Sequence, residues 1–524
     1  MRQVFDQLDK YKFEILAWIV LILVFFTIRL LNLTILPIFA DEAIYVRWTQ
    51  IIAADPAQRF IPLSDGKQPL FMWVAAPFVK FLTFDPLFAV RLVSVLAGFL
   101  GTVGIWLAAY ELFSKRKVAY FAAALYAITP FLVFYDRLAV ADGLLTAIGI
   151  WIFYLGLLLV KKQRLDVALL LGMVFGAGLL TKSPAIFFII LVFAILVLFD
   201  FRQKRWQTKI AKFFGLYFIS LLIGFVIYNI LRLSPLFYLI AQRTNDFILA
   251  PQEALNDPIH RIVPRFATEI PIWLGQYLTW LIFVGGLVFL VYYLCKLKGP
   301  VWVLFLWFFV PLFAESAFAR GFTARYIVFT APFFLLIFAY GLEILATNFF
   351  VKKQKIFIFL IPLIFLPALI FDFWLIFNPQ NADIPRKERS GYLEEWSSGY
   401  GIREIADFLK EKSNKNEILV GTEGRFGTLP DGLQVYLRNV KNVTVVGMGQ
   451  HAEIYTVPED LKNASKEGKL AYLVVNKSRL LADAKDDPAL TLVQSYPKAV
   501  SANNTRDSLL LFEVKQTRFN DLKH

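Results

Sequence analysis

Cysteine and histidine are scarce in this sequence. Its 524 residues include one cysteine, Cys295, and three histidines, which are His260, His451 and His524. A single thiol excludes a disulfide within the chain and any metal cluster held by several cysteines. His260 lies in the loop segment NDPIHRIVPR with no second imidazole nearby in sequence. We therefore expect no metal site at His260.

Charged residues are also few, at 18% of the chain, whereas 58% of the residues are hydrophobic and 54 are phenylalanine. The mean hydropathy is +0.60, and the apolar residues come in long runs rather than at the spacing of a soluble core. Such a composition excludes a soluble globular protein. It predicts a polytopic α-helical membrane protein.

The apolar runs predict about eleven transmembrane helices. We expect them at residues 14–36, 88–113, 118–135, 138–160, 166–181, 184–200, 210–232, 272–295, 301–315, 326–348 and 356–377. The run 169–199 would measure roughly 46 Å as one helix, against a hydrocarbon core of about 30 Å. It is expected to break at the segment TKSP, because Pro184 disfavours helix in the residue before it. The same argument splits 118–160 at the segment YDR.

The net charge of +14 raises nucleic acid as a partner, but the positions of Lys and Arg account for the excess in another way. The basic connections are SKRK (114–117), KKQR (161–164), FRQKRWQTK (201–209), KLK (296–298) and KKQK (352–355). They fall on every second loop, so the positive-inside rule places them and the N-terminus in the cytoplasm. We expect a multi-pass protein of the cytoplasmic membrane and no nucleic-acid partner.

The chain after residue 377 differs in kind from the rest. The segment GIREIADFLKEK predicts an amphipathic helix, and the runs EILVGT, VTVVGM, LAYLVV, LTLVQSY and SLLLFEV predict short strands. We therefore expect two domains: a transmembrane domain at 1–377, with amphipathic helices in an outer loop at 37–87, and an extracytoplasmic α/β domain at 378–524. The predicted fold is a bundle of membrane helices followed by this α/β domain.

Charged side chains gather at the outer ends of different predicted spans. They are Asp41 and Glu42 in LPIFADEAIYVRWTQ, and Lys67, Asp136, Arg137, Asp142, Lys182, Arg320 and Arg325. Carboxylates also serve as caps at helix N-termini, and lysine side chains near helix ends reach to the membrane interface. Both structural alternatives stay open for each residue alone. Because charge at a bilayer boundary is costly, the gathering of so many indicates a functional site.

Five segments carry a resemblance to a known family. They are the Asp-Glu pair, DGKQPLFMW (65–73), YDRLAVADGLL (135–145), GLLTKSPA (178–185) and ARYIVFTAPFFLL (324–336). In this order, over about residues 14–377, they resemble the membrane (GT-C) glycosyltransferases that use polyprenyl-phosphate sugars. This family includes the protein O-mannosyltransferases and the lipid A aminoarabinose transferase. The sequence departs from the family at Gln68, where a second proline is common.

The resemblance implies an inverting transfer of a sugar from polyprenyl phosphate to a hydroxyl of a lipid, glycan or protein acceptor outside the cytoplasm. Such a reaction needs a carboxylate base and cations on the departing phosphate. By resemblance Asp41 is the base, with Glu42 beside it, and Asp142 orients the acceptor or holds a metal. Residues expected to bind the donor phosphate are Lys182, Arg325, Lys67 and Arg137. Asp136 is the alternative to Asp142 by position, and Tyr326 and Arg243 are additional candidates for the site.

Two matters stay open at this point. The resemblance implies no certain cofactor, and a divalent metal ion remains an alternative. The second class of function is a transporter or flippase of a lipid-linked or anionic substrate. The sequence argues against it, because the charged residues gather at one face rather than near the midplane and the two halves show no matching broken helices.

Overall fold

The computed structural model describes residues 2–348, 354–450 and 452–515. The chain divides into two compact units. The first, here called the bundle unit, comprises Met1–Leu33, Ala57–Val74 and Arg91–Pro385. The second, the tail unit, comprises Thr34–Pro56, Ala75–Val90 and Arg386–His524. Two segments that the sequence assigns to an outer loop therefore group with the C-terminal domain, whose predicted start at residue 378 lies close to Arg386.

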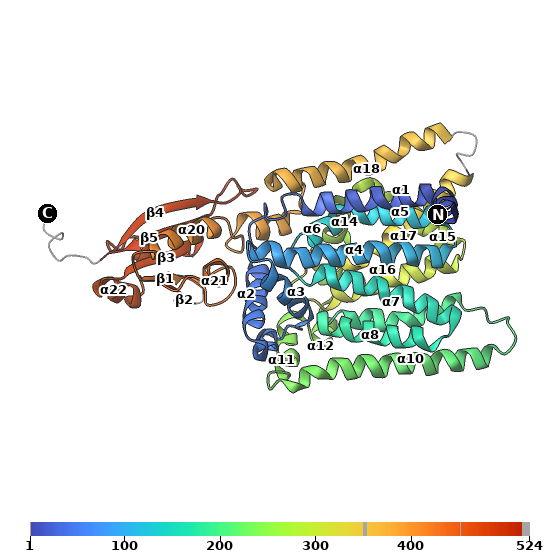
Figure 1. Ribbon diagram of the computed structural model, residues 1–524, viewed down its shortest axis with the longest axis horizontal. Coiled ribbons are helices and arrows are strands. Elements are labelled where there is room, and N and C mark those ends of the chain that lie inside the picture. The colour runs from blue at the N-terminus through green and yellow to red at the C-terminus, as the bar shows by residue number, and fades with distance from the viewer. Residues whose placement is uncertain (1, 349–353, 451, 516–524) are drawn as a thin grey trace. The chain divides into compact units, whose positions relative to one another are not determined.

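The bundle unit consists of helices. They are α1 (Arg2–Leu30), α4 (Pro86–Phe113), α5 (Arg116–Ile128), α6 (Pro130–Asp136), α7 (Asp142–Lys162), α8 (Leu165–Thr181), α9 (Ala185–Leu191), α10 (Trp206–Tyr228), α11 (Tyr238–Phe247), α12 (Pro251–Asn256), α13 (Pro258–Pro264), α14 (Ile270–Tyr277), α15 (Trp280–Cys295), α16 (Gly299–Phe318), α17 (Ala331–Asn348) and α18 (Gln354–Phe377). The long helices run along one another, and α8 packs between α7 and α10 (Figure 1). Helix α3 (Leu70–Phe81) and the first residues of α4 pass from one unit to the other.

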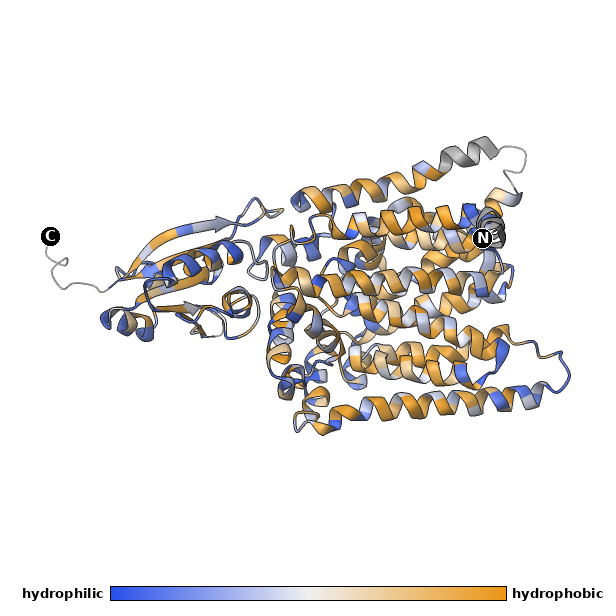
Figure 2. Cartoon of the chain, viewed as in Figure 1, coloured by the Kyte–Doolittle hydropathy of each residue, from blue (hydrophilic) through white to orange (hydrophobic). Residues whose placement is uncertain are grey.

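Six helices of the described chain are long and apolar enough to cross a membrane, or up to eight if two bent pairs each form one span. Four shorter apolar helices accompany them. Figure 2 shows these helices as apolar along most of their length, with hydrophilic residues mainly at their ends. The prediction of a polytopic helical membrane protein is therefore confirmed. The predicted basic connection 352–355 lies partly outside the described residues.

The predicted breaks within the long apolar runs are confirmed. Helix α6 ends at Asp136 and α7 begins at Asp142, while α8 ends at Thr181 and α9 begins at Ala185. The predicted span 272–295 is interrupted. The helical run Pro258–Tyr277, which ends with α14, and helix α15 are bent by 115° at the break between them, where Thr279 has a φ of 70°. This left-handed backbone conformation cannot continue an α-helix.

Two buried arginines hold the end of α1 to the ends of α5 and α6. Arg29 on α1 pairs with Asp136 at 2.9 Å and donates to the carbonyl of Ala127, at the end of α5, at 2.6 Å. Arg137 donates at 2.8–2.9 Å to carbonyls at the end of α1, which are those of Ile28, Arg29, Leu31 and Asn32. The last carbonyls of a helix have no partner within it. Arg29 therefore satisfies a carbonyl at the end of α5, and Arg137 satisfies carbonyls at the end of α1.

The tail unit contains a mixed five-stranded sheet. Its strands are β1 (Ile418–Thr422), β2 (Val443–Gly447), β3 (Leu470–Asn476), β4 (Leu490–Pro497) and β5 (Ser508–Val514), in the order β2-β1-β3-β5-β4. Strands β2, β1 and β3 are parallel, and β5 is antiparallel to β3 and β4. Helices of the unit are α2 (Ala40–Ala54), α20 (Ile402–Ser413), α21 (Asp431–Leu437) and α22 (Glu459–Lys466). All five predicted strands and the predicted amphipathic helix, α20, are confirmed.

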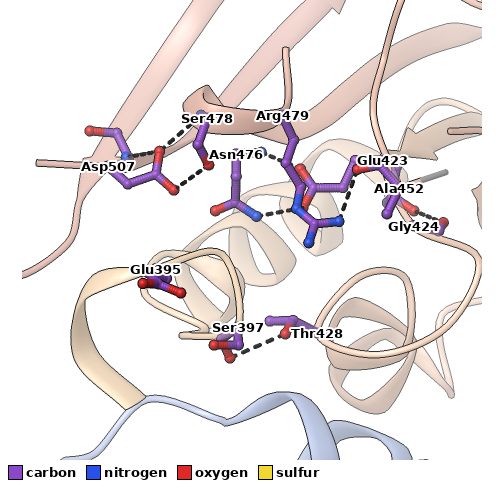
Figure 3. Close-up of polar contacts among 12 residues, drawn as sticks. Glu395, Ser397, Glu423, Gly424, Thr428, Ala452, Asn476, Ser478, Arg479 and Asp507 are labelled. Atoms are coloured by element: carbon purple, nitrogen blue, oxygen red, sulfur yellow. Dashed lines mark hydrogen bonds and ion pairs between the residues drawn. The ribbon is translucent and has the colours of Figure 1, made fainter. Parts of the chain in front are cut away.

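A buried polar cluster lies at the carboxyl ends of β1 and β3 (Figure 3). Glu423 accepts a hydrogen bond from the Asn476 amide at 2.6 Å, and the Arg479 guanidinium lies 3.8 Å from the ring centroid of Trp396. Lys498 donates to the carbonyl of Glu395 at 2.8 Å, and burial lowers the pKa of Lys498 to about 8. These contacts fasten the segment before α20 to the sheet.

We expect the replacement Arg29→Met to lower the free energy of unfolding by about 3–5 kcal/mol, because Asp136 would keep a buried and unpaired charge. The double replacement Arg29→Met, Asp136→Leu should restore part of that loss, since no charge is then left alone. Unfolding by sodium dodecyl sulfate in detergent micelles measures both. Losses that simply add would contradict the pairing.

Candidate functional site

The carboxylate of Asp142 joins three segments of the bundle unit. Asp142 is the first residue of α7 and is fully buried. One of its oxygens accepts from Lys182 Nζ at 2.6 Å, and the other accepts from Arg325 Nε at 2.6 Å. Lys182 follows the last residue of α8, and Arg325 lies in the 3₁₀ turn Ala324–Tyr326 before α17. The structure thus brings together residues from three of the five segments that carry the family resemblance.

These contacts bear on the alternative that Lys182 merely reaches to the membrane interface. Its ammonium lies on a buried carboxylate, and its side chain is 24% exposed; that of Arg325 is 12% exposed. These three side chains, two cations and one carboxylate, together carry one positive charge more than negative at a partly accessible position, which the neighbouring Glu315 partly offsets. Such a surplus is suited to an incoming anion.

Two further residues, Tyr326 and Glu315, interact with Lys182. The Lys182 ammonium lies 5.4 Å from the ring centroid of Tyr326, within the range of a cation–π contact. Glu315, half-buried on α16, interacts electrostatically with both Lys182 and Asp142. Sequence analysis missed Glu315, although an acidic residue near the end of the apolar run VWVLFLWFFVPLFAE was a signal for it.

The loop DGKQP is tied to the segment that carries Lys182 through Gln68, the residue at which the sequence departs from the family pattern. Gln68 donates from its side-chain amide to the hydroxyl of Ser183 at 2.8 Å. Ser183 follows Lys182 directly, so this hydrogen bond ties the loop to the segment that carries the cation. Gly66 allows the tight turn, with a φ of 67°. Gln68 therefore fixes this loop through a side-chain hydrogen bond.

The two other cations expected near this loop have contacts of their own. The Lys67 ammonium lies 4.0 Å from the ring centroid of Phe247 on α11. Arg243, also on α11, pairs with Asp65 at 2.6 Å and with Asp246 at 2.8 Å. Arg243 thus holds the loop, and its part in donor binding stays a prediction, as does that of Lys67.

Asp136 and Arg137, at the end of α6, contact α1 and the residues directly after it. Among the described residues, neither shares a hydrogen bond or an ion pair with Asp142, Lys182 or Arg325. The Arg137 guanidinium is fully buried and bound to backbone carbonyls. Its contacts favour a structural part, and phosphate binding by Arg137 or catalysis by Asp136 stays a prediction without support from this geometry.

Asp41 and Glu42 lie in the tail unit, in the first turn of α2. Glu42 is fully buried and accepts a hydrogen bond from the backbone N–H of Phe39 at 3.0 Å. This is the contact of a capping carboxylate at a helix N-terminus. Asp41 is half-buried beside it. For Glu42 the structure therefore gives the capping alternative a definite contact, while the role of Asp41 as a base stays a prediction.

Candidate metal ligands do not cluster in the described part of the chain. No group of three or more His, Cys, Asp or Glu side chains there could hold a metal ion. The exposed ring of His260 pairs with Asp257 at 2.8 Å, and His451 and His524 lie outside the described residues. The open alternative of a divalent metal ion has no matching set of ligands among these residues.

Comparison with known proteins finds one matching family and several similar solved structures. Residues 66–228 match the family described as dolichyl-phosphate-mannose-protein mannosyltransferase. No curated protein matches the chain. The structure is similar to that of ArnT from Cupriavidus metallidurans bound to undecaprenyl phosphate, with 17% identity, a TM-score of 0.59, and coverage of 96% of this chain and 98% of ArnT.

A second similar structure is the archaeal oligosaccharyltransferase AglB from Archaeoglobus fulgidus, in complex with an inhibitory peptide and a dolichol-phosphate. It shares 12% identity with this chain at a TM-score of 0.56, and the similarity covers 96% of this chain and 74% of AglB. The predicted family resemblance is confirmed by the match over 66–228, and the predicted fold by the structural similarity. Asp142 and Lys182 lie within the matched range.

The cap on α2 leads to a prediction. We expect Glu42→Ala to lower the free energy of unfolding by on the order of 1 kcal/mol, because the N–H of Phe39 loses its acceptor. Glu42→Gln keeps an acceptor oxygen and should lose less. Thermal unfolding in detergent compares the two variants. Equal losses would contradict the capping contact.

Proposed function

We propose that this chain is an inverting glycosyltransferase that moves a sugar from a polyprenyl-phosphate donor to a hydroxyl group of an acceptor outside the cytoplasm. The observation that carries the proposal is the pair of cations, Lys182 and Arg325, held on the buried carboxylate of Asp142. Support also comes from the family match over 66–228 and from the fold shared with ArnT, a protein with undecaprenyl phosphate bound in its structure.

The proposed roles of the two cations follow from their chemistry. The Arg325 guanidinium binds Asp142 through Nε, and a guanidinium is a permanently charged, planar group that suits a phosphate. The Lys182 ammonium has three N–H donors, of which one contacts Asp142. The Lys182 ammonium thus keeps donors for an anion while the carboxylate fixes the positions of both cations. Positive charge placed there in advance stabilises the negative charge that develops on the departing phosphate.

In the proposed reaction the acceptor hydroxyl oxygen attacks the anomeric carbon of the donor sugar. The new carbon–oxygen bond forms as the bond between this carbon and the phosphate oxygen breaks, and the phosphate leaves with the bonding electrons. Asp41 takes the proton of the hydroxyl as general base. The part of Asp41 rests on the family resemblance of its segment, and Asp142 is assigned to positioning Lys182 and Arg325.

The proposed orientation follows from the basic connections. The positive-inside rule places them in the cytoplasm together with the N-terminus. The acceptor side, with the tail unit, is then the extracytoplasmic side. A lipid, a glycan or a protein in that compartment would be the acceptor.

The test uses full-length protein in nanodiscs with a panel of polyprenyl-phosphate sugars, and measures the release of polyprenyl phosphate. We expect Asp41→Asn to slow the release by about 10²–10⁴-fold, the usual contribution of a general base. Lys182→Met and Arg325→Met should each weaken donor binding roughly tenfold to a hundredfold, as expected for a lost hydrogen bond to a charged group.

Lys161→Met is the matched control for Lys182→Met, because Lys161 lies in the last turn of α7, at the end opposite Asp142, and is exposed. It should leave release unchanged. Donor that binds or crosses the bilayer without any release of polyprenyl phosphate would overturn the proposal in favour of a transporter.

Glu315 provides a prediction of opposite sign. Its carboxylate offsets the positive charge of Lys182, so Glu315→Gln should bind undecaprenyl phosphate more tightly. An interaction of about 1 kcal/mol corresponds to roughly a fivefold lower Kd. Binding to protein in nanodiscs measures it, with Glu111→Gln, whose carboxylate pairs with Lys161, as control. Weaker binding would show that Glu315 is needed to shape the site.

A further inference from the structure

The backbone beside Asp41 is held by a distant part of the sequence. Residues 395–399, here called the connector, precede α20 in the same tail unit as α2. Within the connector, the carbonyl of Ser397 accepts a hydrogen bond from the backbone N–H of Ala40 at 3.1 Å. Ala40 is the first residue of α2, and the first N–H groups of a helix have no partner within it. The connector therefore holds the chain at the residue directly before Asp41.

The connector also lies against the residues that lead into α2. Phe39 and Ser398 form an antiparallel β-bridge. At Gly399 an added Cβ atom would overlap the carbonyl oxygen of Ile38. The close approach of the two backbones thus requires a residue without a side chain at position 399. Any side chain there would force the connector and the start of α2 apart.

The carbonyl of Ser397 is fixed from a second side as well. The buried hydroxyl of Thr428 donates to it at 3.1 Å (Figure 3). Thr428 lies between β1 and α21, so this contact ties the connector to the loop that follows a strand of the sheet. A carbonyl oxygen has two lone pairs and can accept both hydrogen bonds. One backbone oxygen therefore joins this loop to the start of α2.

The two residues before Ser397 are anchored to the sheet too. Lys498 donates to the carbonyl of Glu395 at 2.8 Å, and the ring of Trp396 lies against the guanidinium of Arg479. Lys498 directly follows β4, and Arg479 lies shortly after β3. Three successive residues of the connector thus have partners in or next to the sheet. The sheet therefore sets the position of the first turn of α2.

We propose that Thr428 and Gly399 are positioning residues for Asp41. Through the connector they fix the first turn of α2, and with it the carboxylate that takes the proton of the acceptor hydroxyl. This inference rests on the proposed function, in which Asp41 is the general base. A general base acts within hydrogen-bond reach of the proton that it accepts, and a displacement of about 1 Å can cost a hundredfold in rate. The sheet of the tail unit thereby takes part in the reaction without touching the substrate.

The first test uses full-length Gly399→Ala protein in nanodiscs. At a saturating concentration of a polyprenyl-phosphate sugar that the native chain uses, we expect release of polyprenyl phosphate to slow roughly tenfold to a hundredfold. The Kd for undecaprenyl phosphate should stay unchanged, because Lys182 and Arg325 are untouched. The matched control is Gly391→Ala, whose added Cβ would meet its nearest atoms at an ordinary 3.7 Å. It should change neither value, and an equal effect of both replacements would overturn the proposal.

A second variant keeps the test decisive if Gly399→Ala does not fold. Thr428→Val keeps the shape of the side chain and removes the hydrogen bond to the connector, so release should slow roughly threefold to tenfold. Its control is Thr422→Val, which removes a buried hydroxyl that donates to the carbonyl of Gly424 at 3.2 Å instead. Thr428→Val protein that releases polyprenyl phosphate at the native rate, or no more slowly than Thr422→Val protein, would overturn the proposal.

A double replacement distinguishes positioning of the base from other effects on turnover. With Asp41→Asn already present, Thr428→Val should slow release no further, because the group that it positions is gone. A further loss of the same size would contradict positioning. If Asp41→Asn alone leaves release unchanged, the assignment of the base fails. If Asp41→Asn slows release and the connector variants do not, the positioning proposal alone fails.

Discussion

The carboxylate of Asp142, buried between Lys182 and Arg325, is the interaction on which the candidate site depends. Taking one carboxylate out of water is costly, and here two cations at 2.6 Å compensate it. The same contacts place the end of α8, the start of α7 and the turn before α17 at one point. The geometry of the candidate site and the packing of these helices therefore depend on the same atoms. A change of charge at Asp142 would alter the candidate site and the helix packing at once. Variants of Lys182, Arg325 and Glu315 are therefore better suited to separate an effect on the site from an effect on packing.

Composition and hydropathy predicted the class of fold because a membrane constrains a sequence strongly. Apolar runs of about twenty residues leave few alternatives to a helix, and the breaks at YDR and TKSP followed from length. The bend at Thr279 was not predicted, because the predicted span 272–295 is mostly apolar and contains no proline. The strands of the tail unit were predicted from short apolar runs, whereas their order in the sheet depends on crossovers that a single sequence does not display.

The site was predictable as far as charged residues stood at the ends of apolar runs. That rule found Asp142, Lys182 and Arg325, and it also selected Asp136 and Arg137, whose partners are Arg29 and backbone carbonyls. The position of a charged residue along a span indicates that the charge needs a partner. It does not show whether that partner is a bound ligand or the carbonyl groups at the end of another helix. The rule missed Glu315, which lies in the last turn of an aromatic-rich helix, and Ser183, which is uncharged. Both became visible only through their neighbours in space.

The pairing of Arg29 with Asp136 has a consequence for how the protein enters the membrane. The two residues lie 107 positions apart in the sequence, so α1 is synthesised long before its partner. Until then the Arg29 side chain has only the membrane interface to relieve its charge. Helix α1 therefore acquires the carboxylate partner of its buried arginine only after the chain has been synthesised as far as Asp136. A chain truncated before Asp136 would keep Arg29 in α1 without this carboxylate partner.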